Sequence, residues 1–196
     1  MKPIEIEEVQ VSDLQTKLFN NTQKSVVLND SVVVFNKESL TKLINFNSFF
    51  YIKEYGNGMT SSVSVRGTTA SQTAVIWNGI NINSNLTGQT DFNTINTYDF
   101  SSIQLKYGGG SVVYGSGAIG GSIHLNNEMS FKKQMNQFLR LSYGSFNTTN
   151  TNYKFSFSNQ KFSSQFSVSF NKSKNDYEFM GLKKKNLNGE YKNLSY

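Results

Sequence analysis

The feature that most constrains the fold of this chain is a regular alternation of apolar and polar side chains in its last third. Three segments carry it, and their apolar positions are Leu139, Leu141 and Tyr143; Tyr153, Phe155 and Phe157; and Phe166, Val168 and Phe170. The positions between them are polar, mostly Ser, Asn, Gln and Lys. Because successive side chains of a strand point to opposite faces, the pattern predicts strands with one apolar face and one wet face.

Strands of about ten residues with this alternation and many aromatic side chains are typical of outer-membrane barrels. Of the 27 aromatic residues, 14 follow Asn127. A soluble antiparallel sheet shows the same alternation, so the pattern alone leaves both folds open. Three or four strands cannot close a barrel, and lipid does not tolerate an open sheet edge.

The chain up to Asn127 has a different character. It holds 8 basic and 9 acidic residues and 12 of the 15 glycines, whereas residues 128–196 hold 11 basic and 4 acidic residues. Short apolar runs predict strands at residues 31–35, 63–66, 74–77, 80–82, 103–107 and 122–125. Leu40, Leu43 and Ile44 lie at helical spacing, and Asn78-Gly79 predicts a tight hairpin turn. We expect a small α+β unit with long loops.

The chain lacks the residues that most catalytic and metal sites need. It has no cysteine and one histidine, which excludes a thiol nucleophile, a zinc-thiolate site and a set of His ligands. His124 is expected on the polar face of a strand. The sequence Gly115-Ser-Gly-Ala-Ile-Gly120 has the spacing of a dinucleotide motif, but a strand is predicted after it where that motif needs a helix. We therefore expect no catalytic residue, no metal site and no cofactor.

The sequence carries no clear signal for nucleic acid binding or for targeting. Lysines and phenylalanines interleave between residues 154 and 172, but the chain has only two arginines, Arg66 and Arg140, so we expect no nucleic acid partner. There is no long apolar run, and the first residues lack the apolar stretch of a signal peptide. Either an export signal has been removed or the chain is cytosolic.

Three motifs in order indicate a family. Ser64-Val-Arg-Gly-Thr68 resembles its "(I/V)RG" motif, Val75-Ile-Trp-Asn-Gly-Ile80 its "LIDG(I/V)" motif, and residues 111–123 its "SxLYGxxAIGGxI" motif. With the order of the elements, the chain resembles the N-terminal plug domain of TonB-dependent outer-membrane receptors, followed by the first strands of their 22-stranded barrel. Trp77-Asn-Gly79 followed by Gly88-Gln-Thr-Asp91 is similar to the vitamin B12 receptor-like branch.

The resemblance implies a domain organisation and a fold class. Residues 1–30 would be a TonB-box segment and tether, 31–127 the plug domain, and 128–196 the first strands of a β-barrel truncated after Tyr196. The implied fold is α+β, a small mixed-sheet plug with short helices, followed by antiparallel hairpins of an incomplete outer-membrane β-barrel. The plug would lie in the barrel lumen of a Gram-negative outer membrane, with the N-terminus in the periplasm.

The resemblance also implies a function. The expected role is active uptake of a scarce nutrient of the siderophore-iron or cobalamin class, with the plug gating the barrel and with no chemistry on the ligand. The implied partners are TonB with its inner-membrane energising complex, a small nutrient ligand and outer-membrane lipid. The alternative is a standalone exported binding or adhesion module that uses a plug-like sheet without transport.

Candidate site residues fall into three groups. Those resembling the TonB box are Glu8, Val9, Gln10, Val11 and Ser12, although Val9 and Val11 could instead begin the plug's own sheet. Those resembling the ligand-facing loops are Tyr55, Asn57 and Met59 in one loop and Asn85, Leu86 and Thr87 in another, with ordinary turns as the alternative. Arg66 resembles an arginine that, with a second one, locks the plug to barrel glutamates. Tyr107-Gly-Gly109 stands where the family has the second arginine, which leaves this lock open.

The alternation also predicts a topology for the barrel strands. Residues 131–143 would run outward, 144–152 would form the first external loop, 159–161 a tight periplasmic turn, and 176–188 the second external loop. Lys183, Lys184 and Lys185 would then face the cell exterior, where they could meet anionic lipid headgroups or polysaccharide.

Overall fold

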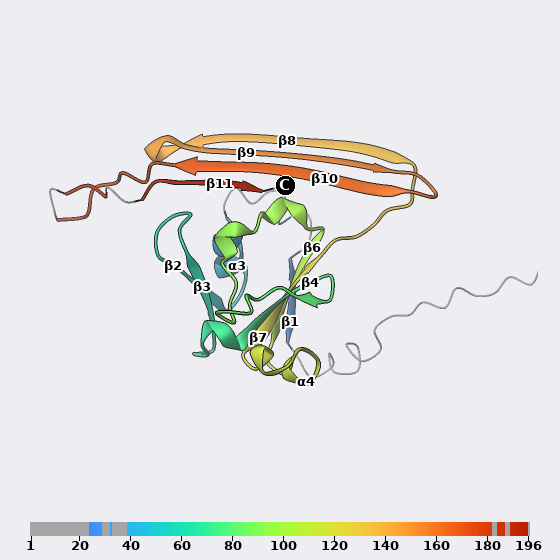
Figure 1. Ribbon diagram of the computed structural model, residues 1–196, viewed down its shortest axis with the longest axis horizontal. Helices are drawn as coiled ribbons and strands as arrows, with labels where there is room; N and C mark the ends of the chain where they lie inside the picture. The colour runs from blue at the N-terminus through green and yellow to red at the C-terminus, as the bar shows by residue number, and fades with distance from the viewer. Residues whose placement is uncertain (1–23, 29–31, 33–38, 182–183, 187–188, 196) are drawn as a thin grey trace, which may run out of the picture.

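The chain forms two parts that lie against each other, a mixed α+β part and an antiparallel sheet (Figure 1). The computed structural model describes residues 24–28, 32, 39–181, 184–186 and 189–195. We call the described part up to Asn127 the plug unit. The sheet that follows, with its connections, is called the wall.

A five-stranded sheet organises the plug unit, in the order β1-β6-β7-β4-β5. Its strands are β1 (Ser25–Leu28), β4 (Thr73–Trp77), β5 (Ile80–Asn81), β6 (Ser102–Tyr107) and β7 (Gly121–Asn126). β4 and β7 are parallel, and the other neighbours are antiparallel. Asn78 and Gly79 have φ angles of 45° and 89°, as a type I′ turn requires, so the predicted β4–β5 hairpin is confirmed.

One face of this sheet is covered by a helix and a hairpin. They are α3 (Leu40–Asn47), β2 (Phe50–Glu54) and β3 (Ser61–Val65). Leu40, Leu43 and Ile44 are buried, so the apolar face predicted for the helix is confirmed. The main core lies between these elements and the sheet, and its largest buried side chains include Phe50, Phe92, Ile103, Leu105, Ile123 and Leu125.

Short helical turns and glycines shape the rest of the plug unit. They are η1 (Ala70–Gln72), η2 (Phe92–Thr94), η3 (Thr97–Asp99), α4 (Ser111–Tyr114) and η4 (Ser116–Ala118). α4 and η4 occupy the glycine-rich stretch, and β7 follows them directly, which confirms the strand predicted after the dinucleotide-like motif. Gly121 must be glycine because an added Cβ would meet the carbonyl oxygen of Lys106 at 2.6 Å.

The N-terminal boundary differs from the expectation. β1 lies inside residues 1–30, for which the resemblance implies a TonB-box segment and a tether rather than a strand of the plug, and it pairs with β6 along Ser25–Leu28. That expectation is therefore wrong for these four residues. The segment has only four residues and is flanked in the sequence by Lys24 and Asn29, so it is too short to show an alternation of apolar and polar side chains. Of the strand predicted at residues 31–35, only Val32 is described, and it lies in no strand.

The wall is an antiparallel sheet in the order β11-β10-β9-β8. Its strands are β8 (Gln134–Gly144), β9 (Thr148–Ser158), β10 (Ser163–Ser173) and β11 (Tyr191–Ser195). The long alternating strands are thus confirmed, as hairpins of an unclosed barrel. The tight turn after β9 is also confirmed, because the N–H of Asn159 donates to the carbonyl of Phe162 at 2.7 Å.

The first external loop is much shorter than predicted. We expected a loop over residues 144–152, but β9 already begins at Thr148. Only η5 (Ser145–Asn147) separates β8 from β9, and Phe146 and Asn147 turn the chain with φ angles of 58° and 56°. The run Thr148-Thr-Asn-Thr-Asn152 is polar on both faces, so its sequence pattern does not distinguish a strand from a loop.

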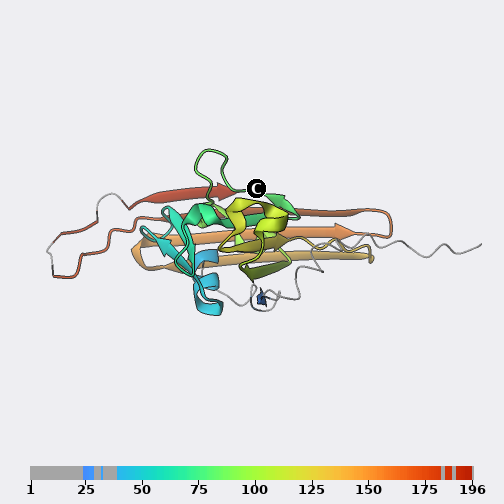
Figure 2. The ribbon, with the colours of Figure 1, turned by 90° about the horizontal axis from the view of Figure 1, so that it is seen from below.

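The two faces of the wall differ as the alternation predicts. Leu139, Leu141 and Tyr143 point away from the plug unit and are 63%, 68% and 77% exposed. The inward positions carry mostly Asn, Ser, Gln and Thr, with two cations, Arg140 and Lys154, and two aromatic rings, Phe138 and Tyr191. The plug unit lies against the inward face, and the long strands extend beyond it on the side of the β9–β10 turn (Figure 2). Within the described residues, no helix combines the length and the apolar character needed to cross a membrane.

Candidate functional site

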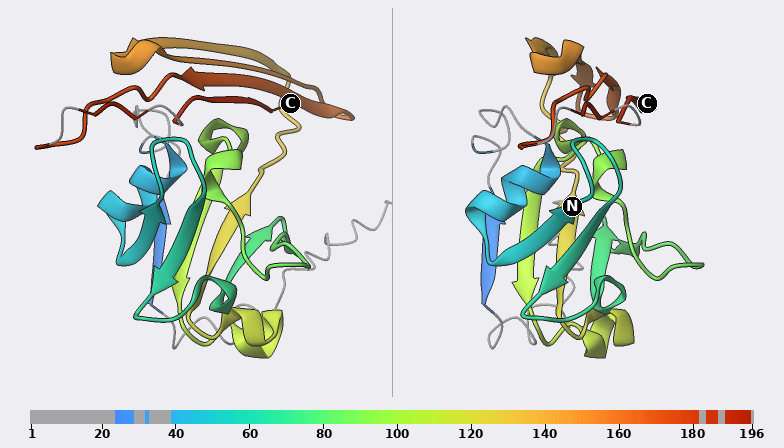
Figure 3. Two further views of the ribbon diagram at one scale, coloured as in Figure 1. Left: turned by 60° about the vertical axis from the view of Figure 1, so that its left-hand side comes forward. Right: turned by 90° about the vertical axis from the view of Figure 1, so that its left-hand side faces the viewer.

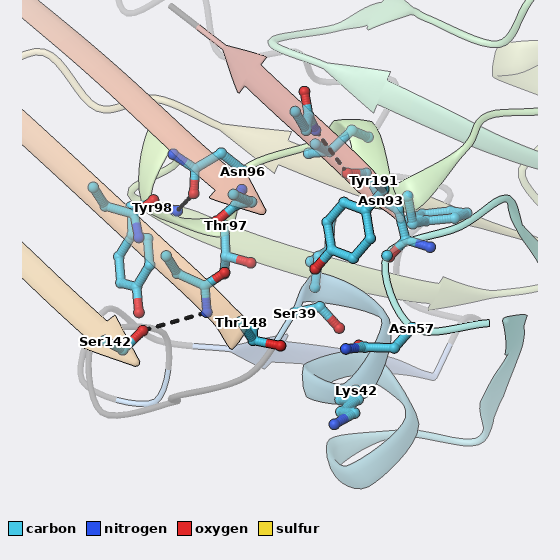
Figure 4. A pocket seen from close by; sticks show the side chains of 18 of the residues that line it. Ser39, Lys42, Asn57, Asn93, Asn96, Thr97, Tyr98, Ser142, Thr148 and Tyr191 are labelled. Carbon is cyan, nitrogen blue, oxygen red and sulfur yellow. Dashed lines mark hydrogen bonds between the residues drawn. The ribbon is translucent and has the colours of Figure 1, made fainter. Parts of the chain in front are cut away.

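A polar cavity of about 380 Å³ lies where the plug unit meets the wall (Figure 4). Ser39 and Lys42 at the start of α3, Asn57 in the β2–β3 turn, and the segment around η2 and η3 line it on the plug side. All four wall strands line the opposite side. The cavity therefore exists only because the two parts of the chain are docked.

A row of amide side chains forms the wall side of the cavity. The strand register places Ser142, Asn150, Asn171 and Asn193 next to one another on β8, β9, β10 and β11. Asn150 Nδ2 donates to Ser142 Oγ at 3.3 Å, and Asn193 Nδ2 donates to the main-chain carbonyl of Asn93 at 3.1 Å. Each carboxamide carries a donor and an acceptor, so the row suits a ligand with many polar groups.

The charges around the cavity have one sign. Lys42 and Arg140 are among the lining residues, and none of the described residues that line it is an aspartate or glutamate. Cationic side chains attract anionic groups most strongly where water is partly excluded. The cavity is therefore suited to a negatively charged or polar group.

Tyr98 is held by the wall at the edge of this cavity. η3 is capped by Asn96, whose Oδ1 accepts the N–H of Tyr98, so the turn presents the tyrosine to β8. The Arg140 guanidinium donates to the Tyr98 hydroxyl and lies 5.4 Å from its ring centroid. Phe138 packs on the same ring at 5.4 Å. Burial raises the pKa of Tyr98 above its ordinary value, although Arg140 acts in the opposite direction.

The neighbouring strands hold the main chain of the same turn. Lys154 Nζ on β9 donates to the carbonyl of Tyr98 at 2.9 Å, and Gln165 Nε2 on β10 donates to the carbonyl of Asp99 at 3.2 Å. Burial raises the pKa of the Asp99 carboxyl, an effect that a hydrogen bond from Ser167 and the charge of Lys154 reduce. Three wall strands thus converge on η3.

A second cavity, of about 760 Å³, lies between the plug unit and the part of the wall near the β9–β10 turn. The connection from β7 to β8 borders it. Trp77 Nε1 donates to Asn127 Oδ1 at 2.7 Å, and Asn78 Oδ1 accepts the N–H of Asn127 at the same connection. These bonds fix the point where the chain leaves the plug unit for the wall.

The first predicted ligand loop reaches the wall rather than an open apex. Asn57 lines the cavity, and its main-chain carbonyl accepts a hydrogen bond from Asn175 Nδ2 at 2.6 Å. The side chain of Tyr55 is exposed beside Lys53, whose Nζ lies 4.7 Å from the ring centroid. The carbonyl of Met59 accepts a hydrogen bond from the Asn93 amide. Of the three predicted residues, only Asn57 borders the cavity.

The second predicted ligand loop lies elsewhere. Asn85, Leu86 and Thr87 are exposed, Leu86 to 94%, and none of them lines the cavity. They belong to the loop after β5, the edge strand, and Figure 3 shows that it projects away from the β2–β3 turn. The structure therefore does not bring the two predicted loops together within this chain. A role in ligand binding for either loop stays a prediction.

Arg66 has a partner within the plug unit. It follows β3 with a φ of 52°, and its guanidinium lies 5.6 Å from the ring centroid of Tyr107. The Tyr107 hydroxyl accepts the N–H of Phe49 at 2.9 Å. In the described part of the chain no carboxylate lies within ion-pair distance of Arg66. The lock to barrel glutamates stays a prediction, and Glu8, Val9, Gln10, Val11 and Ser12 lie outside the described residues.

His124 lies in β7 on the same face as the polar Ser122, as predicted, but this face is buried. His124 is only 6% exposed, and its Nε2 is 2.8 Å from Ser122 Oγ. Tyr114 packs edge-on against the ring at 5.2 Å, and Lys106 is buried nearby. Burial, with a further contribution from the charge of Lys106, lowers the pKa of His124 to about 4. The polar alternation of β7 was read correctly, but α4 and η4 cover that face.

Sequence reasoning missed Arg140, Lys154 and Tyr98 as functional candidates. Arg140 and Lys154 occupy inward positions of alternating strands, and a cation at such a position is a signal that could have identified them. The contact of Arg140 with Tyr98 joins residues 42 apart in the sequence, and only the docked structure shows it.

Comparison with known proteins connects this geometry to a family. Residues 17–122, more than half of the chain, match the family model described as TonB-dependent Receptor Plug Domain. The vitamin B12 transporter BtuB of Vibrio vulnificus (strain YJ016) is 29% identical over 150 residues, which are 70% of this chain and 24% of that protein. The chain therefore spans about a quarter of the length of this curated relative.

Solved receptors share the fold of both parts. The ferric yersiniabactin uptake receptor FyuA of Yersinia pestis aligns with a TM-score of 0.59 and 20% identity, over 78% of this chain and 24% of that one. FpvA of P. aeruginosa, solved with bound pyoverdines, aligns with a TM-score of 0.60 and 13% identity, over 79% of this chain and 21% of its own. The chain belongs to the TonB-dependent receptor family and contains its plug domain.

Proposed function

We propose that this chain is the N-terminal part of an outer-membrane receptor that takes up a scarce nutrient of the siderophore-iron or cobalamin class. The plug unit gates the barrel whose first strands are β8 to β11. The observation that carries the proposal is the docking of a family plug on the polar, inward face of strands whose other face is apolar. An apolar outer band with a polar interior is the arrangement of a transmembrane barrel.

The relatives support uptake as the activity. The curated relative is a vitamin B12 transporter, and the similar solved structures include a ferric yersiniabactin uptake receptor. Both ligand classes carry many polar groups, which agrees with a cavity lined by amides and cations. In this role the receptor binds the ligand outside and releases it inside, and the plug performs no reaction on it.

Energy coupling is assigned to the segment Glu8–Ser12. Its alternation around Val9 and Val11 suits an extended strand that adds to the edge of TonB's sheet, where backbone hydrogen bonds supply affinity. The segment precedes β1 by only about a dozen residues. A pull on it would therefore reach the edge of the plug sheet first.

The test separates uptake from surface binding in the complete receptor. Val11→Pro removes a main-chain donor and fixes φ, so it should abolish energy-dependent uptake of the radiolabelled nutrient while cells still bind it at their surface. Thr16→Pro, placed outside the proposed box, is the matched control and should keep both activities. Loss of surface binding together with uptake in Val11→Pro would show that the segment is structural, and full uptake would place the box elsewhere.

A further inference from the structure

Arg140 belongs both to the lining of the cavity and to the contact that docks the plug unit on the wall. It lines the cavity, and its guanidinium also donates to the hydroxyl of Tyr98 and lies over the ring of that residue. Tyr98 belongs to η3, the turn by which the plug unit is docked on three wall strands. A group that takes the same Nη1–H of Arg140 in the cavity therefore competes with a docking contact of the plug unit.

The hydroxyl of Tyr98 competes only weakly with an anion for the guanidinium of Arg140. Burial raises its pKa, so it is a neutral phenol at neutral pH. A guanidinium binds a charged oxygen more strongly than a neutral one, and it can hold a carboxylate through two parallel hydrogen bonds. An anionic oxygen that enters the cavity is thus the better partner for Arg140.

The rest of the cavity fits such a group. Lys42 supplies a second positive charge, and the amides of Asn150, Asn171 and Asn193 supply neutral donors and acceptors beside it. The described lining contributes no carboxylate that would repel an anion. The charge and the polar row therefore favour an anion that carries further polar groups.

We infer that this cavity binds an anionic oxygen group of the transported ligand, such as a carboxylate, and that this group displaces the Tyr98 hydroxyl from Arg140. The inference rests on the proposed function, because it takes the cavity to lie on the ligand's path. When the site is filled, η3 keeps its contacts with Lys154 and Gln165, and the Tyr98 ring keeps Phe138, but the Tyr98 hydroxyl loses its hydrogen bond from Arg140. Ligand binding and loosening of the plug then share one residue.

The experiment uses the complete receptor in detergent micelles, with citrate as the probe and calorimetry at fixed ionic strength as the measurement. Citrate should bind, and its neutral triethyl ester should not. Arg140→Gln should weaken citrate binding at least about tenfold, the loss expected for a charge-assisted pair. Lys161→Gln removes an equal charge at the distant β9–β10 turn and should leave the affinity unchanged.

Tyr98→Phe distinguishes competition from simple support of the fold. Because it removes the competing hydroxyl and keeps Arg140, it should tighten citrate binding about threefold, the value of one neutral hydrogen bond. If Tyr98 only supports the fold, Tyr98→Phe should bind citrate as tightly as the wild type or more weakly, and that result would overturn the inference. This variant and Arg140→Lys, which keeps the charge, also serve if Arg140→Gln does not fold.

Hydrogen exchange tests the loosening itself. Citrate should speed the exchange of the backbone amides of residues 97–99 in the wild type and have no such effect in Tyr98→Phe. Slower or unchanged exchange in the wild type would overturn the displacement step. Nutrient uptake without citrate binding would refute this inference alone, whereas citrate binding without uptake would refute the proposed function and leave the anion site.

Discussion

Single residues in this chain often serve the fold and the docking at the same time. Gly58 has a φ of 72° and packs directly on the ring of Tyr191, so the conformation of the β2–β3 turn also sets how closely that turn meets β11. His124 is buried beside Lys106, and its neutral form is the one that the fold accommodates. Substitutions at both positions should change the stability of the fold in ways that can be measured.

The buried His124 should make the plug sensitive to acid. Its pKa is about 4 in the folded chain and about 6.5 when unfolded, so the unfolded state binds the proton first as the pH falls. The stabilisation is complete above about pH 6.5 and is lost between there and pH 4, by about 3 kcal/mol at most. The measurement is the urea midpoint of plug unfolding between pH 7 and pH 4.5, reported by thiol labelling of Ala118→Cys.

His124→Gln provides the control for this pH dependence. It keeps a polar group next to Ser122 but has no proton to bind in this range. The fall of the urea midpoint between pH 7 and pH 4.5 should therefore be smaller in this variant. An identical pH dependence in both proteins would assign it to other groups.

Gly58→Ala should weaken the contact between the plug unit and β11. Both Gly58 and Gly67 have positive φ, at 72° and 81°, so alanine strains the backbone at either position. Only at Gly58 would the new Cβ overlap another side chain, the ring of Tyr191, because nothing lies within 4 Å of the corresponding point at Gly67. We expect Gly58→Ala to cost about 1–3 kcal/mol more than Gly67→Ala in urea unfolding. Equal costs would show that the turn adjusts freely.

At the scale of elements, some helices and strands can be predicted from sequence patterns, whereas the side-chain contacts that hold the loops cannot. The wall strands follow from period-two alternation, and the β4–β5 hairpin follows from Asn78-Gly79. One side-chain amide, that of Asn83, ties the loop after β5 to β4 and to its own far end. Asn83 Oδ1 accepts the N–H of Val75, and its Nδ2 donates to the carbonyls of Thr73 and Gly88. The side chain of Asn83 therefore supports the loop that carries Leu86, together with the loop's own backbone hydrogen bonds between Ser84, Gly88 and Gln89.

Asn83→Ala should open this loop without unfolding the plug. It removes all of these side-chain hydrogen bonds, and we expect a local loss of about 2 kcal/mol. The measurement is hydrogen exchange of residues 84–90, which should speed up. Asn85→Ala removes an exposed amide of the same kind and should leave the exchange unchanged. Equal exchange in both variants would mean that the backbone alone closes the loop.

The elements that sequence reasoning missed lack a visible period. β2 escaped notice because Tyr51 is an aromatic residue on its exposed face, 62% exposed, so the run Phe49-Phe-Tyr-Ile52 does not alternate. The site was only partly predictable for a different reason. Asn57 was expected from its loop, but the cavity depends on how the plug unit docks on the wall, and pattern within one strand carries no information about that contact.

At the scale of the whole molecule, the ends of the wall strands define two sides. The β8–β9 turn and the long connection from β10 to β11 leave the sheet at one end, and the β9–β10 turn leaves it at the other (Figure 1). The described lysines of the long connection, Lys184 and Lys185, are exposed. In a receptor with its N-terminus in the periplasm, the first of these ends faces outward.

Cysteine labelling of the complete receptor in intact cells checks this orientation. A membrane-impermeant maleimide should label Ser145→Cys and Lys185→Cys directly. It should label Gln160→Cys, in the tight turn at the other end, only after the outer membrane is permeabilised. The chain has no cysteine of its own, so these labels report single positions within it. Labelling in the reverse pattern would invert the topology.

Four of the hydrogen bonds by which the wall holds the plug unit share a property that the contact of Arg140 with the Tyr98 hydroxyl lacks. Asn175, Asn193, Lys154 and Gln165 all donate to main-chain carbonyls, those of Asn57, Asn93, Tyr98 and Asp99. Every residue type offers the same main-chain carbonyl, so these four bonds depend on the path of the backbone and not on the side chains along it. A plug of foreign sequence that follows the same backbone path would therefore meet the same four donors, and a chimaera that also keeps Tyr98 and Gly58 would retain the contacts that depend on side chains.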